Sequence, residues 1–186
     1  VMGQMQESLG PKPGDEPIAH YLNVLSDKTG SLIALAAEMG IRMANGPELL
    51  IPAVRAFGEK IGIAFQLVDD VIDLADRSAG TGKPPGTDVR HGVTTLPMLF
   101  LREDAANNDA SGALLATLGR GAAGDLSEDE FQDAIAALRS HEATERTMDK
   151  AREMADEAIA HLDVAPEGIV KDALVRFAHQ VVDRSY

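Results

Sequence analysis

The sequence from Phe65 to Pro97 reads FQLVDDVIDLADRSAGTGKPPGTDVRHGVTTLP, and it decides the fold expected for the whole chain. Its first residues continue an apolar pattern with the helical period of about 3.6 residues. One apolar stripe consists of Val54, Phe57, Ile61, Phe65, Val68 and Ile72. A helix that is apolar around most of its circumference is expected to be buried. We therefore predict a buried central helix from Pro47 to near Asp76, followed by a loop rich in glycine and proline from Arg77 to Thr94.

One strip of this helix is not apolar. It consists of Gly58, Gly62, Gln66, Asp69 and Asp73, with Asp70 at its edge. Asp69 and Asp73 are four residues apart, so their carboxylates project side by side. Charged carboxylates on a buried helix are costly unless a cation compensates them, and the strip holds no Lys or Arg. Oxygen ligands favour Mg²⁺ or Ca²⁺ over zinc. The strip therefore indicates a divalent-metal site.

Two further interpretations of this strip follow from its residues. It could instead be a polar surface, or the face that receives a partner helix. Gly58 and Gly62 leave that side of the helix bare, which gives room for another helix or for a ligand. We expect the strip to line a cavity that is partly open to solvent or covered by a second chain.

The segments FQLVDDVIDL, GTGKPPGTDV and TTLP occur in this order. Together they resemble the second aspartate-rich region of trans-isoprenyl diphosphate synthases, the polyprenyl synthetase family. The resemblance covers most of the chain and implies an all-α, isoprenoid-synthase-type helical bundle. In that family the region holds Mg²⁺ against an allylic diphosphate. The resemblance implies Asp69, Asp70 and Asp73 as metal ligands, with Gln66 and Lys83 binding substrate.

A second segment of interest is DKTGSLIALAAEMG, within a helix predicted from about Pro17 to Met39. The apolar stripe of that helix consists of Tyr21, Val24, Leu25, Leu32, Leu35 and Met39, and Lys28 lies at its centre. Either the lysine extends along the core to water, or it faces an anion in a cavity. The segment is similar to the family's K-T element, which contacts the allylic diphosphate. This resemblance implies Lys28 and Thr29 as substrate-binding residues.

By resemblance, the function is that of a Mg²⁺-dependent trans-prenyltransferase that condenses an allylic diphosphate with isopentenyl diphosphate. Lys28, Asp69 and Asp70 are the implied catalytic residues. Mg²⁺ withdraws charge from the leaving diphosphate, and isopentenyl diphosphate attacks the allylic cation. No side-chain nucleophile is needed, and the sequence shows no Ser/His/Asp or Cys/His arrangement. The alternatives are a non-catalytic subunit or structural remnant and, ranked lower, a class I terpene cyclase.

The chain departs from the family in two ways. No segment matches the family's first aspartate-rich motif, which lies upstream of the second. We therefore expect residues 1–186 to be a single, partial prenyl synthase domain, the C-terminal portion, inactive alone and homodimeric in the full-length form. Many relatives also place a lysine just before the T-L-P element, where this chain has Val93. Arg90 or His91 could replace that lysine.

Composition restricts the partners. The formal net charge of −13 argues against nucleic-acid or anionic-membrane binding by bulk charge. The absence of cysteine excludes disulfides and thiolate chemistry. No apolar run approaches the length of a membrane span, so we expect no stable membrane insertion and a cytoplasmic location.

Further helices are predicted at 96–105, 111–118, 127–139 and 141–162, with a last helix opened by Pro166.

Overall fold

The computed structural model describes residues 2–75 and 84–184, and this part of the chain contains helices and no strand. The all-α prediction is confirmed. The chain forms two compact units. The first unit joins residues 1–68 to residues 150–185, and the second unit contains Asp69–Asp149. That residues 1–186 make a single domain stays a prediction. Among the described helices, none is both long and apolar enough to cross a membrane.

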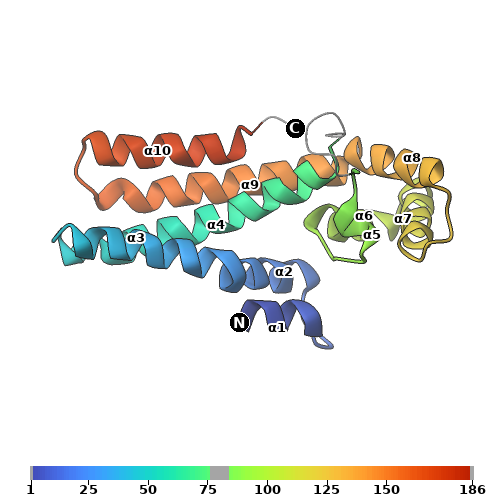
Figure 1. Ribbon diagram of the computed structural model, residues 1–186, viewed down its shortest axis with the longest axis horizontal. Coiled ribbons are helices and arrows are strands. Elements are labelled where there is room, and N and C mark those ends of the chain that lie inside the picture. Colours follow the sequence, from blue (N-terminus) through green and yellow to red (C-terminus); the bar gives the residue numbers. More distant parts are fainter. Residues whose placement is uncertain (1, 76–83, 185–186) are drawn as a thin grey trace. The chain divides into compact units, whose positions relative to one another are not determined.

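The first unit is a helical bundle (Figure 1). Its elements are α1 (Met2–Leu9), α2 (Pro17–Leu25), the π-helical turn η1 (Ser26–Gly30), α3 (Ser31–Met43), the 3₁₀ turn η2 (Glu48–Leu50), most of α4 (Ile51–Asp73), the second half of α9 (Glu142–His161), the 3₁₀ turn η3 (Leu162–Val164) and α10 (Ile169–Val182). Pro17 opens α2 as predicted, and the Glu16 carboxylate caps it by accepting from the backbone N–H groups of Ile18 and Ala19.

The predicted helix from Pro17 to Met39 is interrupted by η1. A π turn holds an extra residue, so the side chains beyond it are rotated relative to a regular helix. Leu32, Leu35 and Met39 are consequently 65%, 50% and 44% exposed, and Ala34 faces the core instead. The predicted apolar stripe was therefore right for Val24 and Leu25 and wrong beyond the turn.

The central helix α4 is buried as predicted, but it begins at Ile51 and not at Pro47, because Glu48–Leu50 form the 3₁₀ turn η2. Val54, Phe57, Ile61 and Val68 are buried, while Phe65 and Ile72 are half-buried. The π turn η1 covers Gly62 of the polar strip, and helix α3 covers Gly58. A Cβ added at Gly62 would lie 2.6 Å from the Gly30 Cα, and one at Gly58 would lie 2.8 Å from the Ala34 Cα. The glycines therefore make room for the close approach of another helical segment. The prediction that the strip lines a cavity is wrong for Gly58 and Gly62.

The second unit contains the end of α4, then α5 (Thr87–Arg90), α6 (Leu96–Ala105), α7 (Asp109–Ala122), α8 (Glu128–Arg139) and the first part of α9. Its core gathers Leu74, Val89, Leu101, Leu118, Phe131, Ala134, Ile135, Leu138 and Ala143. Helix α6 has the predicted bounds, and α8 begins with a capping box between Ser127 and Glu130. The glycine- and proline-rich loop was expected to be irregular up to Thr94, but it contains the one-turn helix α5.

Candidate functional site

Asp70 is almost completely buried, at 8% exposure. Its carboxylate caps a helix that follows later in the chain. Its Oδ2 accepts a hydrogen bond of 3.1 Å from the backbone N–H of Leu96, the first residue of α6. The preceding residue, Thr95, makes no side-chain cap bond of its own. The first N–H groups of a helix lack partners within the helix and attract a negative charge. This contact accounts for a carboxylate at an otherwise apolar position.

Asp73 makes a similar connection to α5. Its Oδ2 accepts from the backbone N–H of Asp88 at 3.0 Å, and its backbone carbonyl accepts from Gly86 N–H at 2.7 Å. Gly86 has φ +75°, a left-handed conformation that glycine adopts without strain. Asp70 and Asp73 therefore attach the segment after the loop to the end of α4.

Asp69 is half-buried and lies between Gln66 and Asp73 on successive turns of α4. Its carboxylate and that of Asp73 offer the hard oxygen donors that suit Mg²⁺. Within residues 2–75 and 84–184, however, no three Asp, Glu or His side chains converge to hold a metal ion. The donor chemistry fits a divalent cation, and the assignment of Asp69, Asp70 and Asp73 as its ligands stays a prediction.

Lys28 and Thr29 lie in the π turn η1, a type of irregularity that is frequent at functional sites. The Thr29 hydroxyl donates to Gln66 Oε1 on α4 at 2.7 Å. The Lys28 ammonium donates to both carboxylate oxygens of Glu7. From the sequence, the Lys28 ammonium was expected either to reach water or to face an anion in a cavity. Neither alternative included a carboxylate partner from α1. No periodicity in the sequence pairs α1 with η1.

Comparison with known proteins adds an independent result. The family model described as polyprenyl synthetase matches residues 1–138. The chain belongs to the polyprenyl synthetase family. It is 36% identical to nonaprenyl diphosphate synthase of Mycobacterium tuberculosis over 99% of this chain and 53% of that protein. It is 28% identical to octaprenyl diphosphate synthase of Haemophilus influenzae over 99% of this chain and 54% of that protein.

Solved structures of this family have the same fold. The geranylgeranyl pyrophosphate synthase of Corynebacterium glutamicum, complexed with calcium and isoprenyl diphosphate, matches with a TM-score of 0.80 and 36% identity, over 98% of this chain and 55% of that one. The polyprenyl synthase of Caulobacter crescentus, in complex with the same ligands, matches with a TM-score of 0.81 and 28% identity, again over 98% and 55%. The chain thus spans about half the length of these relatives. That this half is the C-terminal one stays a prediction.

For a polyprenyl synthetase, the basic residues around the loop are of direct interest. Lys83 lies outside the described residues. Arg90 donates to both oxygens of Glu128, at 2.7 Å and 2.9 Å, and its guanidinium lies 4.3 Å from the centre of the Phe131 ring. Hydrogen bonds from Gln132 and Arg90 hold the pKa of Glu128 below its usual value. Arg90 is therefore already bound to a carboxylate. His91, beside it, is exposed.

A Ser, His and Asp side chain do meet in the second unit, which the sequence analysis missed. Ser111 Oγ lies 3.0 Å from His141 Nε2, and His141 Nδ1 lies 3.9 Å from Asp104 Oδ2. The ring has the orientation of a hydrolase triad but the other tautomer, because Nδ1 accepts the backbone N–H of Ala143 at 3.1 Å and so cannot donate to Asp104. Ser111 is also only 2% exposed. The cluster holds the start of α9 and does not compete with prenyl-transfer chemistry.

An open pocket of about 370 Å³ lies in the second unit. It is lined by Leu74, Pro84, Pro85, Glu128, Gln132, Ile135, Ala136 and Arg139. None of the predicted site residues within 2–75 and 84–184 lines it. The candidate residues that the structure describes therefore lie on helix α4 and the turn η1 of this polyprenyl synthetase chain, and not in this pocket.

Proposed function

We propose that this chain is the diphosphate-binding part of a Mg²⁺-dependent trans-prenyltransferase, which condenses an allylic diphosphate with isopentenyl diphosphate to make polyprenyl diphosphates. The observation that carries the proposal is the hydrogen bond from Thr29 to Gln66. It attaches the Lys28–Thr29 turn to the same helix that bears Asp69, Asp70 and Asp73. Relatives solved with calcium and isoprenyl diphosphate support the chemistry of a divalent cation beside a diphosphate.

Each candidate residue has a distinct task in this proposal. Asp69 would be the principal ligand of Mg²⁺, supported by Asp70, Asp73 and Gln66. Bound there, Mg²⁺ would draw negative charge from the leaving diphosphate. Lys28 and Lys83 would donate to diphosphate oxygens as point charges, while the Thr29 hydroxyl, oriented by Gln66, would add a neutral donor. Asp70 and Asp73 would also keep α6 and α5 attached to the end of α4.

The remaining parts of the proposal concern the longer protein. We propose that a full-length form is a homodimer in the cytoplasm and binds no nucleic acid.

A non-catalytic subunit is the second candidate function for this chain. It is favoured by the hydrogen bonds that commit Asp70 and Asp73 to backbone N–H groups and Lys28 to Glu7.

Thermal melts with Mg²⁺ and inorganic diphosphate test the proposed function. A ligand that binds only the folded state stabilises it by about 2.7 kcal/mol at 100 times its dissociation constant. We expect the melting temperature of the unaltered chain to rise by several degrees. Asp69→Asn removes an anionic ligand and should abolish most of this rise, and Lys28→Ala should reduce it.

Matched controls separate ligand binding from simple charge effects. Asp133→Asn removes an exposed carboxylate on α8, and Lys171→Ala removes a lysine paired with Glu167. Both control variants should keep the full response. A response of Asp69→Asn equal to that of the unaltered chain would show that the carboxylates are structural, as the second candidate requires.

A further inference from the structure

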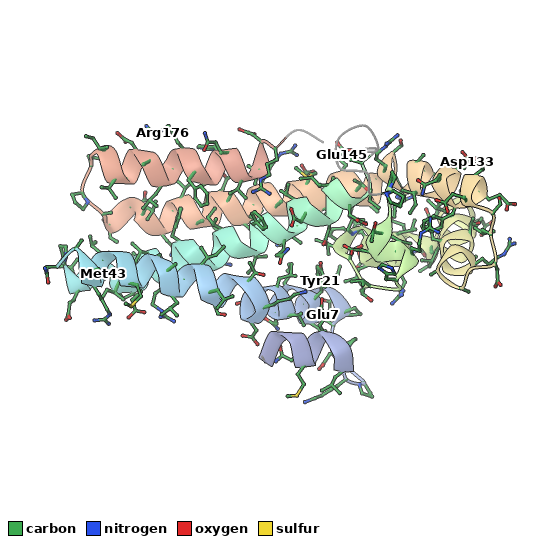
Figure 2. All side chains as sticks on the ribbon, viewed as in Figure 1. Glu7, Tyr21, Met43, Asp133, Glu145 and Arg176 are labelled. Atoms are coloured by element: carbon green, nitrogen blue, oxygen red, sulfur yellow. The ribbon has the colours of Figure 1, made fainter. Side chains whose placement is uncertain are left out.

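The ammonium of Lys28 is held by a carboxylate from another helix. Nζ donates to Glu7 Oε1 at 3.0 Å and to Oε2 at 3.1 Å. The two side chains are 36% and 32% exposed, so most of each is covered by the protein. Figure 2 labels Glu7 on α1, beside α2. The pair between Glu167, which precedes α10, and Lys171 on α10 differs, because its glutamate is 84% exposed.

Close backbone packing fixes this pair in place. A Cβ added at Gly3 would lie 2.6 Å from the backbone nitrogen of Lys28 and 2.9 Å from the carbonyl carbon of Asp27. Only glycine allows α1 to approach η1 so closely. Glu7 follows Gly3 by four residues and therefore lies on the same face of α1. The carboxylate is placed at Lys28 by the packing of two elements, unlike a pair between long side chains on one exposed helix.

We propose that Glu7 is a positioning residue for Lys28, and that it makes the turn select a metal-bound diphosphate over a free one. This inference rests on the proposed function, since it assumes that Lys28 binds diphosphate. Two of the three donors of an ammonium are directed at Glu7. A diphosphate that reaches Lys28 therefore meets a carboxylate only one hydrogen bond away.

The charge of the incoming ligand decides the strength of this repulsion. Free diphosphate carries several negative charges, each of which is repelled by Glu7 at short distance. Mg²⁺ cancels part of that charge before the ligand reaches Lys28. The chain's formal net charge of −13 repels free diphosphate in the same direction. Glu7 thus fixes the direction of the Lys28 side chain and weakens the binding of a diphosphate without metal.

Isothermal titration calorimetry with inorganic diphosphate tests this inference, in one arm with a chelator and in the other with Mg²⁺. Glu7→Gln keeps the size of the side chain and one oxygen acceptor but removes its charge. We expect this variant to bind metal-free diphosphate about fivefold more tightly than the unaltered chain does. Its gain in affinity on adding Mg²⁺ should shrink by a similar factor.

Two variants serve as controls for this experiment. Glu7→Asp keeps the charge and should retain the metal selectivity of the unaltered chain. Glu167→Gln removes a carboxylate that is also paired with lysine and should change neither affinity. If Glu7→Gln keeps the original ratio of the two affinities, or if Glu7→Asp loses that ratio, the inference is overturned while the proposed function stands. If the unaltered chain binds no diphosphate even with Mg²⁺, both are overturned.

Discussion

Several polar side chains of this chain have both a structural partner and a predicted role in catalysis or substrate binding. Thr29 donates to Gln66, Lys28 binds Glu7, and Asp70 caps α6. Asp70 explains why a carboxylate can be buried at little cost, since a charge near unpaired helix N–H groups is stabilised. These contacts fix the directions of the side chains before any ligand binds, which is a requirement for precise recognition of a diphosphate.

Replacing Asp70 should reveal its capping role. Asp70→Ala leaves the Leu96 N–H without its acceptor in a buried setting, at a cost of about 2 kcal/mol or more. Asp70→Asn retains an oxygen acceptor and should lose less. Urea unfolding of the two variants measures the difference in unfolding free energy. Equal stability of the alanine variant and the unaltered chain would show that the capping bond contributes nothing.

The Thr29–Gln66 bond permits a second test at this scale. Thr29→Val keeps the shape of the side chain and removes its donor, so the unfolding free energy should fall by about 1 kcal/mol. Thr117 is a suitable control, because its hydroxyl donates to the Ala113 carbonyl within its own helix, α7. Thr117→Val should change stability by less than about 0.5 kcal/mol. A larger loss at Thr117 than at Thr29 would contradict this account.

At the scale of elements, contacts between backbones fix the position of η1, the π turn that contains Lys28 and Thr29. The π turn η1 lies against Gly62 of α4 on one side and against Gly3 of α1 on the other. The sequence predicts helices on both sides of η1, but it does not predict the turn itself. A 3.6-residue pattern can be continued across Lys28 without a break, and the extra residue shows only in the exposure of Leu32 and Leu35.

Glycine substitutions test this packing. Gly62→Ala would put its methyl group 2.6 Å from the Gly30 Cα, and backbone atoms cannot yield cheaply. We expect a loss of about 1–3 kcal/mol, as for overpacked cores. At Gly40, on the exposed side of α3, an added Cβ meets nothing within 4 Å. Gly40→Ala should therefore stabilise the chain by up to about 1 kcal/mol. Thermal melts that reverse the order of these two variants would refute the close approach of the helices.

The ion pair between Lys60 on α4 and Glu157 on α9 gives a pH dependence. The hydrogen bond from Lys60 lowers the pKa of Glu157 below its usual value in the folded state. The stabilisation is therefore present above the unfolded pKa and is lost as the pH falls through the lower folded pKa. Glu157→Gln should cost less than about 1 kcal/mol at pH 7, and this difference should vanish once the pH has fallen below the lowered folded pKa. Urea midpoints across that range measure it; a difference that persists in acid would exclude the charge as its source.

At the scale of the whole molecule, the sequence predicts the helical class, the long central helix and the bounds of α6, because strong periodicity and proline or glycine boundaries carry that information. It predicts neither the partner of Lys28 nor the Ser111–His141 contact. Both join residues far apart in the chain, and no local pattern encodes which helices meet. The metal-ligand roles of Asp69, Asp70 and Asp73 stay predictions.

The 186-residue chain should not elongate a prenyl chain by itself. It contains one D-D-x-x-D cluster, at Asp69 to Asp73, and no second cluster. Incubation with Mg²⁺, isopentenyl diphosphate and an allylic diphosphate should yield no longer product, as analysed by chromatography of the hydrolysed prenols. Turnover by the purified 186-residue chain would contradict the need for a second aspartate cluster.

The most direct test of the central claim is a crystal of this chain grown with Mn²⁺ and inorganic diphosphate, with the anomalous difference map measured at the manganese edge. Mn²⁺ prefers the same oxygen ligands as Mg²⁺ and reports its own position. The account predicts an anomalous peak within coordination distance of an Asp69 oxygen, with diphosphate density in contact with Lys28. A map with no peak at Asp69, or with the only peaks at other carboxylates, would contradict it.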